Sequence, residues 1–388
     1  MTGQRLQPQQ IAHRRIVVKI GSNVLTGGTD SLAPSVIAGI VEQIADLVGR
    51  GAQVLVVSSG AVAAGRHRLR THAEARGVAQ QAGRDLQSKQ VLAAIGQSRL
   101  MALWDELFEQ QAVPIAQALL TRRDLADRIG YLNARNTLLG LVEVGVVPIV
   151  NENDVVSIEE LRESSIGDND NLSAQVANLV DANLLLLLTD IAGLYTADPS
   201  RDPSARLIEE VPLIDEAIIA AAGGTSGMRG TGGMVTKVQA ARIATQGGAH
   251  VVIADGSTRD VVLRAAAGEP VGTHFAPTGD RMESRRRYLL SGLQAKGTVT
   301  VDAGAAAALL RGANSLLPAG VTACEGAFVR GDVIHVVTAD GRRLASGMTN
   351  YSSQDVLRIM GRQSGQIAEI LGYELGEEVI HRNNLVLV

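Results

Sequence analysis

A glycine-rich stretch that ends in a lysine, Gly223–Lys237 (GGTSGMRGTGGMVTK), contains residue types that bind phosphate groups. Six of its fifteen residues are glycine, which lets main-chain N–H groups approach a ligand closely. A helix predicted over Val238–Ala249 would place those N–H groups near a helix N-terminus, where anions are favoured. The stretch is not a Walker A loop, because Thr236 and Val238 flank the lysine. By itself it fits a phosphate cradle and a flexible surface loop equally well.

Further polar residues follow short apolar runs that are typical of buried strands. Each of them alone is also typical of a turn or a helix cap. In an open parallel sheet, however, ligands bind beyond the carboxyl ends of the strands, so these positions would meet at one edge. They are Lys19 with Gly21–Asn23, Ser58–Gly65, Asn151–Asp154, Gly167–Asn171, Thr189 with Asp190, and Gly193–Asp198.

The chemistry of these clusters favours phosphoryl transfer. Lys19 interrupts the apolar run Ile16–Ile20, and a buried lysine needs a partner. Ser59 does not lie in a nucleophile elbow and no histidine lies in these clusters, so catalysis would rest on positioning and charge stabilisation. A carboxylate acceptor suits the site best, because it is already ionised and needs no general base. The substrate would be an amino acid with its ammonium group on Asp154 or Asp170.

The elements that must position these residues alternate between strand and helix. Helices are predicted between the strands, and repeated βα units of this kind give a mostly parallel sheet with helices on both faces. The sequence therefore predicts an α/β fold, a three-layer αβα sandwich. The predicted strands are Ile16–Ile20, Val54–Val57, Val113–Leu120 (edge or irregular, because of its proline), Val146–Val150, Leu184–Thr189 and Val251–Ala254; the helices are 36–48, 90–110, Leu132–Val144, Leu172–Val180, Val238–Thr245 and Asp260–Ala267.

A second, smaller domain is predicted after Pro277. We expect a first domain over residues 1–278, a polar and basic linker over 279–295, and a β-rich domain over 296–388. Its short strands are predicted at Val299–Val301, Ala327–Val329, Val333–Val337 and Leu344–Met348, with a hairpin turn at Asp340-Gly341.

Composition excludes several classes of protein. The net charge of −4 gives no general attraction to nucleic acid or acidic lipid. The single cysteine, Cys324, cannot form an intrachain disulfide, and Cys/His metal-ligand spacing is absent. The longest aliphatic run, Leu184–Leu188, is too short for a bilayer and the N-terminal residues do not form a secretory signal, so we expect a cytoplasmic protein.

Together, the polar clusters resemble the amino acid kinase family, and within it the enzymes that phosphorylate the γ-carboxylate of glutamate. The C-terminal part is similar to the PUA domain that some bacterial members carry. The segments that carry the resemblance are VVKIGSNVLTGG (Val17–Gly28), SSGAVAAGR (Ser58–Arg66), LAAIGQSRLMALW (Leu92–Trp104), LNARNTL (Leu132–Leu138), PIVNENDVV (Pro148–Val156), GDNDNLSA (Gly167–Ala174), LLLLTDIAGLYTADP (Leu185–Pro199) and GTGGMVTKVQAA (Gly230–Ala241).

The resemblance implies a role for each site residue. Lys19 and Lys237 would neutralise charge on the transferring phosphoryl group, and Asp170 would orient both lysines. Glutamate would bind Ser59, Asp154 and Asn169. ATP would contact Lys19, Thr189, Asp190, Thr231, Gly232, Gly233, Met234, Val235, Thr236 and Lys237.

The resemblance also implies the reaction and its partners. ATP and L-glutamate would give ADP and γ-glutamyl phosphate, the first step of proline synthesis, with Mg²⁺ held largely by phosphate oxygens and water. Proline would inhibit the enzyme, a homo-oligomer, and the labile product would pass to glutamyl phosphate reductase.

Nucleic-acid binding is the alternative function, because PUA domains elsewhere bind RNA. Arg281 and Arg285–Arg287 form the one sharp basic run, which is more typical of a solvated linker. The C-terminal domain also lacks the clustered aromatic residues on which bases stack, so RNA is not the expected partner.

Overall fold

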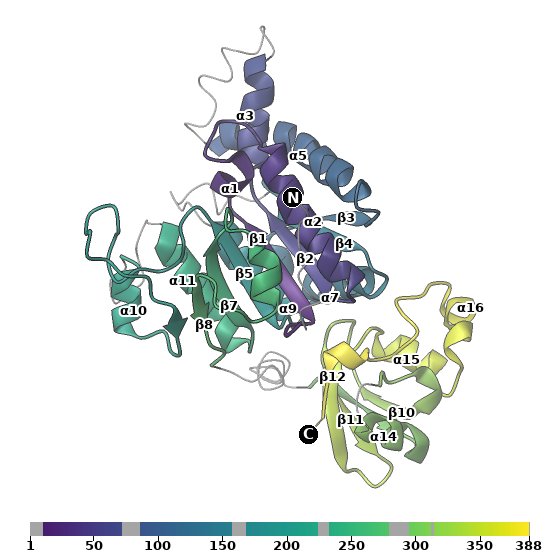
Figure 1. The fold of residues 1–388 in the computed structure, drawn as a ribbon. Helices are drawn as coiled ribbons and strands as arrows, with labels where there is room; N and C mark the ends of the chain where they lie inside the picture. The colour runs from purple at the N-terminus through teal and green to yellow at the C-terminus, as the bar shows by residue number, and fades with distance from the viewer. Residues whose placement is uncertain are drawn as a thin grey trace. The chain divides into compact units, whose positions relative to one another are not determined.

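The computed structural model describes residues 11–71, 86–156, 168–223, 233–278, 295–311 and 314–387. It divides into two compact units, which we describe separately (Figure 1). The first comprises Met1–Ala126 and Asn133–Asp280, and the second comprises Asp127–Leu132 and Arg281–Val388.

An eight-stranded sheet forms the centre of the first unit, with the strand order β3-β4-β2-β1-β5-β7-β8-β6. The first six strands in this order are parallel to their neighbours, β8 is antiparallel to β7, and β6 is parallel to β8, which confirms the mostly parallel sheet. The strands are β1 (Arg15–Ile20), β2 (Gln53–Ser58), β3 (Ile115–Leu120), β4 (Val147–Glu152), β5 (Leu184–Thr189), β6 (Glu210–Val211), β7 (His250–Asp255) and β8 (Thr273–Phe275). β3 is at the end of the order, as its proline suggested.

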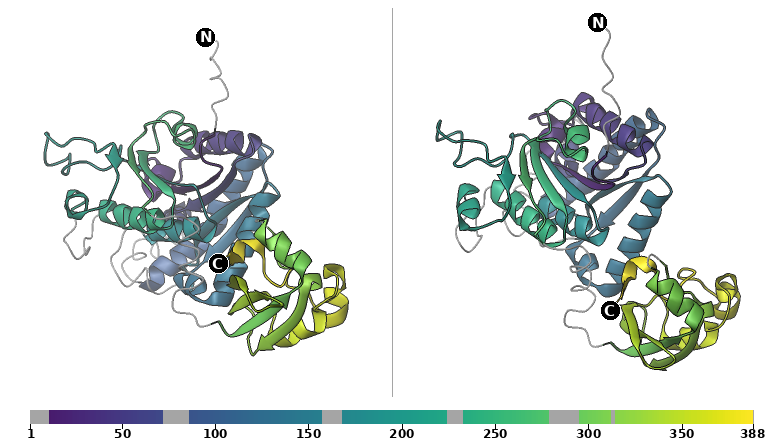
Figure 2. Two further views of the ribbon diagram at one scale, coloured as in Figure 1. Left: turned by 90° about the horizontal axis from the view of Figure 1, so that it is seen from below. Right: turned by 60° about the horizontal axis from the view of Figure 1, so that its bottom comes forward.

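Helices cover both faces of this sheet (Figure 2). The helices up to the end of this unit are α1 (Ser22–Thr26), α2 (Pro34–Gly49), α3 (Ala61–Thr71), α5 (Leu86–Glu109), α6 (Arg122–Ala126), α7 (Arg128–Glu143, whose first residues belong to the second unit), α9 (Asp168–Leu179), α10 (Glu216–Ala221), α11 (Gly233–Gln246) and α12 (Val261–Ala266). Among the described residues, no helix is both long and apolar enough to cross a membrane.

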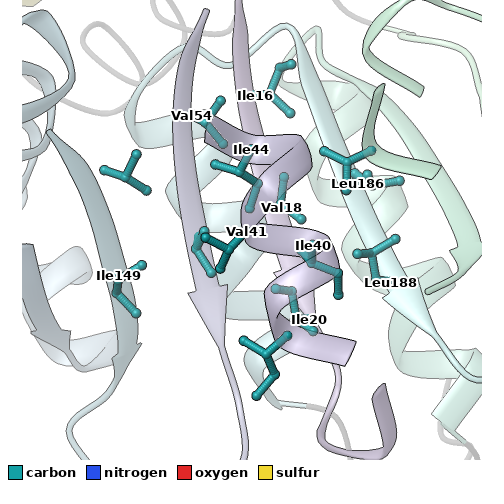
Figure 3. Close-up of a cluster of buried hydrophobic side chains, with 14 of the residues drawn as sticks. Ile16, Val18, Ile20, Ile40, Val41, Ile44, Val54, Ile149, Leu186 and Leu188 are labelled. Atoms are coloured by element: carbon teal, nitrogen blue, oxygen red, sulfur yellow. The ribbon is translucent and has the colours of Figure 1, made fainter. Parts of the chain in front are cut away.

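Alternation along β1 decides which side chains face which layer. Ile16, Val18 and Ile20 join a buried cluster with the apolar face of α2, as Figure 3 shows. Because successive strand residues point to opposite faces, Val17 and Lys19 point to the other face, which α9 covers. The alternation of side chains along β1 therefore buries the neighbours of Lys19 and also points Lys19 toward the start of α9.

The second unit contains a five-stranded sheet in the order β10-β9-β11-β12-β13. Its elements are β9 (Gly297–Val301), α14 (Ala303–Leu310), η2 (Pro318–Gly320), β10 (Val321–Gly326), β11 (Val333–Thr338), β12 (Arg343–Met348), α15 (Ser353–Ile359), η3 (Ser364–Gln366), α16 (Ile367–Leu371), η4 (Arg382–Asn384) and β13 (Leu385–Leu387). The predicted β11–β12 hairpin is present, with Gly341 at a φ of 82° in the turn.

One predicted strand of this unit is wrong. Ala327–Val329 lies outside any strand, and the strand is instead β10, which ends at Gly326. The apolar character of this stretch comes from Phe328, which is 4% exposed. Phe328 packs so closely over Gly297 that a Cβ there would lie 2.4 Å from its ring. The residue was apolar because it fills the core, not because it belongs to a sheet.

Candidate active site

The predicted site residues converge where β1, β2, β4 and β5 end and α9 and α11 begin. Contacts between side chains join several of them into a lysine–aspartate cluster and an amide cluster, and Asp154 and the pair Thr189 and Asp190 are described after these. Thr231 and Gly232 lie outside the described residues, and so do the basic residues Arg281 and Arg285–Arg287.

A buried ion pair forms the centre of the lysine–aspartate cluster. The Nζ atom of Lys19 lies 2.5 Å from Oδ1 of Asp170, which is the third residue of α9. Lys19 is 4% exposed and Asp170 is fully buried. The lysine that interrupts an apolar strand therefore has the partner that its burial requires.

Lys237 approaches the same carboxylate from α11. Its Nζ atom lies 3.4 Å from Oδ2 of Asp170 and donates a hydrogen bond to the carbonyl of Gly233 at 3.1 Å. The hydroxyl of Thr236 also donates to Oδ2 of Asp170, at 2.8 Å. A single carboxylate thus holds two lysines that come from two different elements, β1 and α11.

Burial and charge oppose one another in this cluster. Burial alone would raise the pKa of Asp170, but Lys19 and Lys237 and the hydrogen bonds to this carboxyl hold it below its ordinary value. Burial lowers the pKa of Lys19, and the positive charge of Lys237 lowers it further, against the attraction of Asp170. Asp170 is therefore an ionised carboxylate, and the two ammonium groups beside it would gain from an added anion such as a phosphate.

The amide cluster lies at the ends of β2 and β4. Asn169 Nδ2 lies 3.2 Å from Ser59 Oγ and 3.3 Å from Asn151 Oδ1. Asn151 Nδ2 in turn donates to Gln97 Oε1 at 2.9 Å. The Oδ1 atom of Asn169 and the Nε2 atom of Gln97 are buried and have no hydrogen-bond partner among the described residues. Unpaired buried amides next to Ser59 are expected where a polar ligand completes the network.

Asp154 lies just beyond β4, and its carboxyl has no countercharge among the described residues. Burial raises its pKa to about 6. No ion pair joins it to any basic group in the part of the chain that the structure describes. Its backbone carbonyl accepts a hydrogen bond from Gln90 Nε2 at 3.1 Å, which fixes the segment against α5. A substrate ammonium group would supply the missing charge.

Thr189 is the last residue of β5 and Asp190 follows it, beside the first turn after β1. Asp190 accepts hydrogen bonds from Asn23 Nδ2 at 2.8 Å and from the hydroxyl of Thr189 at 3.1 Å. Gly21 lies between β1 and β5, where a Cβ would be 3.3 Å from the carbonyl of Leu188 and 3.8 Å from Lys19 Nζ. This position thus keeps space beside the lysine.

The end of the glycine-rich stretch differs from its prediction as a loop. Gly233–Lys237 belongs to α11, so Lys237 is the fifth residue of the helix, and its side chain reaches back one turn to the carbonyl of Gly233. Val235 is 2% exposed and contributes to the interior, whereas Met234 is partly exposed. The sequence Met-Val-Thr-Lys has no glycine or proline to stop a helix, and the helix therefore begins five residues before the predicted Val238.

Two glycines position the amide cluster by bringing α3 and α5 into close contact. A Cβ on Gly65 would lie 1.9 Å from the carbonyl of Leu92, and one on Gly96 would lie 1.8 Å from the carbonyl of Ala61. Gln97 follows Gly96 directly, so the helix contact that only glycine permits also fixes Gln97 against Asn151.

Asn23 and Asn151 were among the polar positions predicted at the sheet edge but were given no role, and Gln97 was not predicted outside the family resemblance. Asn23 and Asn151 follow predicted strands, but their types are equally common in turns. Gln97 lies inside a long helix and carries no local signal, although its segment belongs to the family resemblance.

Comparison with known proteins agrees with this architecture. A family model described as "Amino acid kinase family" matches residues 14–255. The chain belongs to the amino acid kinase family. A second model, for the PUA domain, matches residues 297–371, which confirms the expected similarity of the C-terminal part.

Relatives similar over nearly the whole chain share the name glutamate 5-kinase. The one from Dehalococcoides mccartyi is 50% identical over 376 residues, 97% of this chain and 99% of that protein. Those from Herpetosiphon aurantiacus and Vibrio vulnificus are 49% and 47% identical and cover 96% and 97% of this chain and 98% and 96% of their own lengths. The expected resemblance is confirmed, and as an amino acid kinase family member the chain is an enzyme of the kinase class.

Proposed function

We propose that this enzyme transfers the γ-phosphoryl group of ATP to the γ-carboxylate of L-glutamate and forms γ-glutamyl phosphate and ADP. The observation that carries the proposal is the pairing of Lys19 and Lys237 on the single buried carboxylate of Asp170. The names of the relatives support the choice of glutamate. The carboxyl of Asp154, which has no countercharge in the part of the chain that the structure describes, supports an amino-acid substrate.

The proposed transfer needs no general base. The γ-carboxylate of glutamate is ionised at neutral pH, so its oxygen attacks the γ-phosphorus directly while the bond to the bridging oxygen of ADP breaks. Negative charge shifts to that bridging oxygen and spreads over the transferring group. Lys19 and Lys237 stabilise this charge from two sides, and Asp170 positions both ammonium groups.

Substrate binding divides between the two clusters. We assign the ammonium group of glutamate to Asp154 and its remaining polar groups to Ser59 and Asn169. We assign the nucleotide to Lys19, Thr189 and Asp190 and to residues 231–237, whose first two members are not described by the structure. α11 then points its N-terminal N–H groups at the phosphates, which favours anion binding.

Mg²⁺ is expected to enter as part of the nucleotide substrate. No group of three or more His, Cys, Asp or Glu side chains among the described residues is placed to hold a metal ion. Asp170 is already engaged by two lysines, so phosphate oxygens and water remain the natural ligands, as Mg²⁺ prefers.

The product suggests the place of the enzyme in the cell. An acyl phosphate hydrolyses readily, so we propose that a glutamyl phosphate reductase consumes it, in the first step of proline synthesis. We further propose that proline inhibits the enzyme by feedback and that the enzyme is a homo-oligomer in the cytoplasm. Its chain would divide into two domains, 1–278 and 296–388, joined by a linker (279–295).

A hydroxylamine-trapping assay tests the proposal, because hydroxylamine converts acyl phosphates into stable hydroxamates. We expect a signal that requires both ATP and L-glutamate, that proline reduces, and that is absent with acetylglutamate, aspartate or carbamate. Because UDP is not an acyl phosphate, UMP is tested by the release of ADP, which should not occur. A signal with another acceptor but none with glutamate would overturn the choice of substrate.

A further inference from the structure

A chain of three side-chain amides runs from α5 to the residues that we assign to glutamate. Gln97 on α5 accepts a hydrogen bond from Asn151 in β4 at 2.9 Å. Asn169 on α9 donates through Nδ2 to Asn151 Oδ1 at 3.3 Å and to Ser59 Oγ at 3.2 Å. Asn169 and Ser59 have a role in the function proposed above, whereas Gln97 has none, and an inference about Gln97 rests on that function.

A backbone group sets the direction of the hydrogen bonds in this chain. The main-chain N–H of Glu152 donates to Asn151 Oδ1 at 2.9 Å. The oxygen and nitrogen of a side-chain amide are assigned from their surroundings, and a main-chain N–H can only donate, so this contact identifies the amide oxygen of Asn151. The amide nitrogen of Asn151 must then face Gln97, which must offer it an oxygen.

Asn151 depends on Gln97 for the hydrogen bond of its amide nitrogen. Asn151 is 2% exposed, so its side chain cannot turn to water for another acceptor. Gln97 Oε1 is the acceptor that the described residues offer to Asn151 Nδ2. A buried donor that loses its acceptor is costly. Without the oxygen of Gln97, the amide of Asn151 would therefore shift or turn.

Asn169 in turn depends on the position of Asn151. The hydrogen bonds of Asn151 with Gln97 and Glu152 are both 2.9 Å long, whereas the two that Asn169 donates, at 3.2 and 3.3 Å, are longer than usual. The amide nitrogen of Asn169 has two hydrogens, one for Asn151 and one for Ser59. If the amide of Asn151 turned, its nitrogen would face the nitrogen of Asn169, and this contact would be lost. A change at Gln97 would therefore reach the substrate residues through Asn151.

We propose that Gln97 is a positioning residue for glutamate binding. It acts through Asn151, whose oxygen it keeps turned toward Asn169, and it thereby keeps Asn169 beside Ser59. Among the described residues, no hydrogen bond joins this chain of amides to the lysine–aspartate cluster. Gln97 therefore affects the binding of glutamate and leaves the binding of ATP and the phosphoryl transfer unchanged.

The test is the steady-state kinetics of Gln97→Met, which keeps the length of the side chain and removes the acceptor. KM for glutamate should rise about three- to tenfold, the value of one neutral hydrogen bond, with kcat and KM for ATP unchanged. Ser98→Ala is the matched control, because Ser98 is exposed and its hydroxyl donates to the carbonyl of Ile95 in the same helix; it should change none of the three constants. An unchanged KM for glutamate in Gln97→Met would overturn the proposal, as would an equal loss in kcat or in KM for ATP, which would indicate general structural damage.

A double substitution tests whether Gln97 acts through Asn151. In the Asn151→Ala protein the intermediate residue is gone, so Gln97→Met should raise KM for glutamate no further, and a full additional increase would contradict the proposed route.

Two comparisons keep the outcome decisive. If Gln97→Met does not fold, Gln97→Ala takes its place, because it leaves room for a water that accepts from Asn151 without fixing its position, and the same rise in KM is expected. The unmodified protein separates the two proposals. No hydroxamate from ATP and glutamate would overturn the proposed function and this inference with it, whereas a normal signal with an unchanged KM in the Gln97 variant would overturn this inference alone.

Discussion

Lys19 Nζ and Asp170 Oδ1 lie 2.5 Å apart, in a position where neither side chain meets bulk water. Folding therefore buries the charges of Lys19 and Asp170 together, and the carboxylate of Asp170 also pairs with Lys237. Such a cluster is not needed for stability alone, because hydrophobic residues of similar volume often stabilise a fold to the same extent or more. The arrangement is more readily explained by the chemistry that we propose for it.

Lys237→Ala should reduce kcat by about 10²–10³-fold, because one of the two cations that stabilise the transferring phosphoryl group is lost. KM values should change less, since Lys19 and the backbone groups remain. Steady-state kinetics of the trapping assay measure both. Lys296→Ala, at a 55%-exposed lysine of the second unit, is the matched control and should leave kcat unchanged. An unchanged kcat in Lys237→Ala would remove the proposed role of this lysine.

Asp170→Asn should destabilise the protein by about 3–5 kcal/mol, because it leaves buried lysine charge without its carboxylate. Thr236→Val removes one hydrogen bond to the same carboxyl and should cost about 1 kcal/mol. Denaturant unfolding at neutral pH measures both. Equal effects of the two substitutions would show that the charge of Asp170 is unimportant for the fold.

The contribution of Asp170 to stability depends on pH, and the direction of its pKa shift determines how. The folded-state pKa of Asp170 lies below its unfolded value, so the ionised group stabilises the fold above about pH 4, and the contribution is lost as the pH falls through the folded-state pKa. Asp170→Asn should therefore lose its stability deficit only in strong acid. A deficit that disappears already between pH 5 and 7 would contradict this assignment.

Asp154 should make stability depend on pH in the opposite direction to Asp170. Its pKa of about 6 lies above the unfolded value, so the group binds more protons in the folded state, and it makes stability fall as the pH rises from about 4 to 6. Asp154→Asn should remove that slope.

The same titration should appear in catalysis. Only ionised Asp154 can pair with a substrate ammonium group, so kcat/KM for glutamate should rise with pH through about 6. In Asp154→Asn this rise should be absent and KM for glutamate should increase, with KM for ATP unchanged as the internal control. A variant that keeps both the rise and the KM would exclude Asp154 from glutamate binding.

Gly96→Ala should destabilise the first unit by about 1–3 kcal/mol, because its Cβ would enter the space of the Ala61 carbonyl and force α3 from α5. Gly140→Ala, inside α7 with nothing within 4 Å of the new Cβ, should instead stabilise by about 0.5–1 kcal/mol. Thermal unfolding compares the two. A neutral Gly96→Ala would mean that the helices can separate at little cost.

Much of the fold could be predicted because its signals are local. Apolar runs such as Leu184–Thr189, and the amphipathic face of α2, are readable from spacing alone, and their alternation predicts the parallel sheet. Ala327–Val329 was misassigned because a short apolar run does not reveal whether it pairs with a strand or fills a core. The start of α11 was misplaced because the glycine content before Val238 suggested a loop.

The sequence by itself determined that Lys19 lies within an apolar strand, among neighbours that are buried, and that polar residues follow several strands. It left open whether Asp154 or Asp170 would hold a substrate ammonium group. Only the tertiary structure shows that Asp170 is engaged by two lysines and that Asp154 has no countercharge among the described residues, which supports the proposal that Asp154 binds the ammonium group. The physical reason is that charge partners come from β1, α9 and α11, which are far apart in the chain and meet only when the sheet forms.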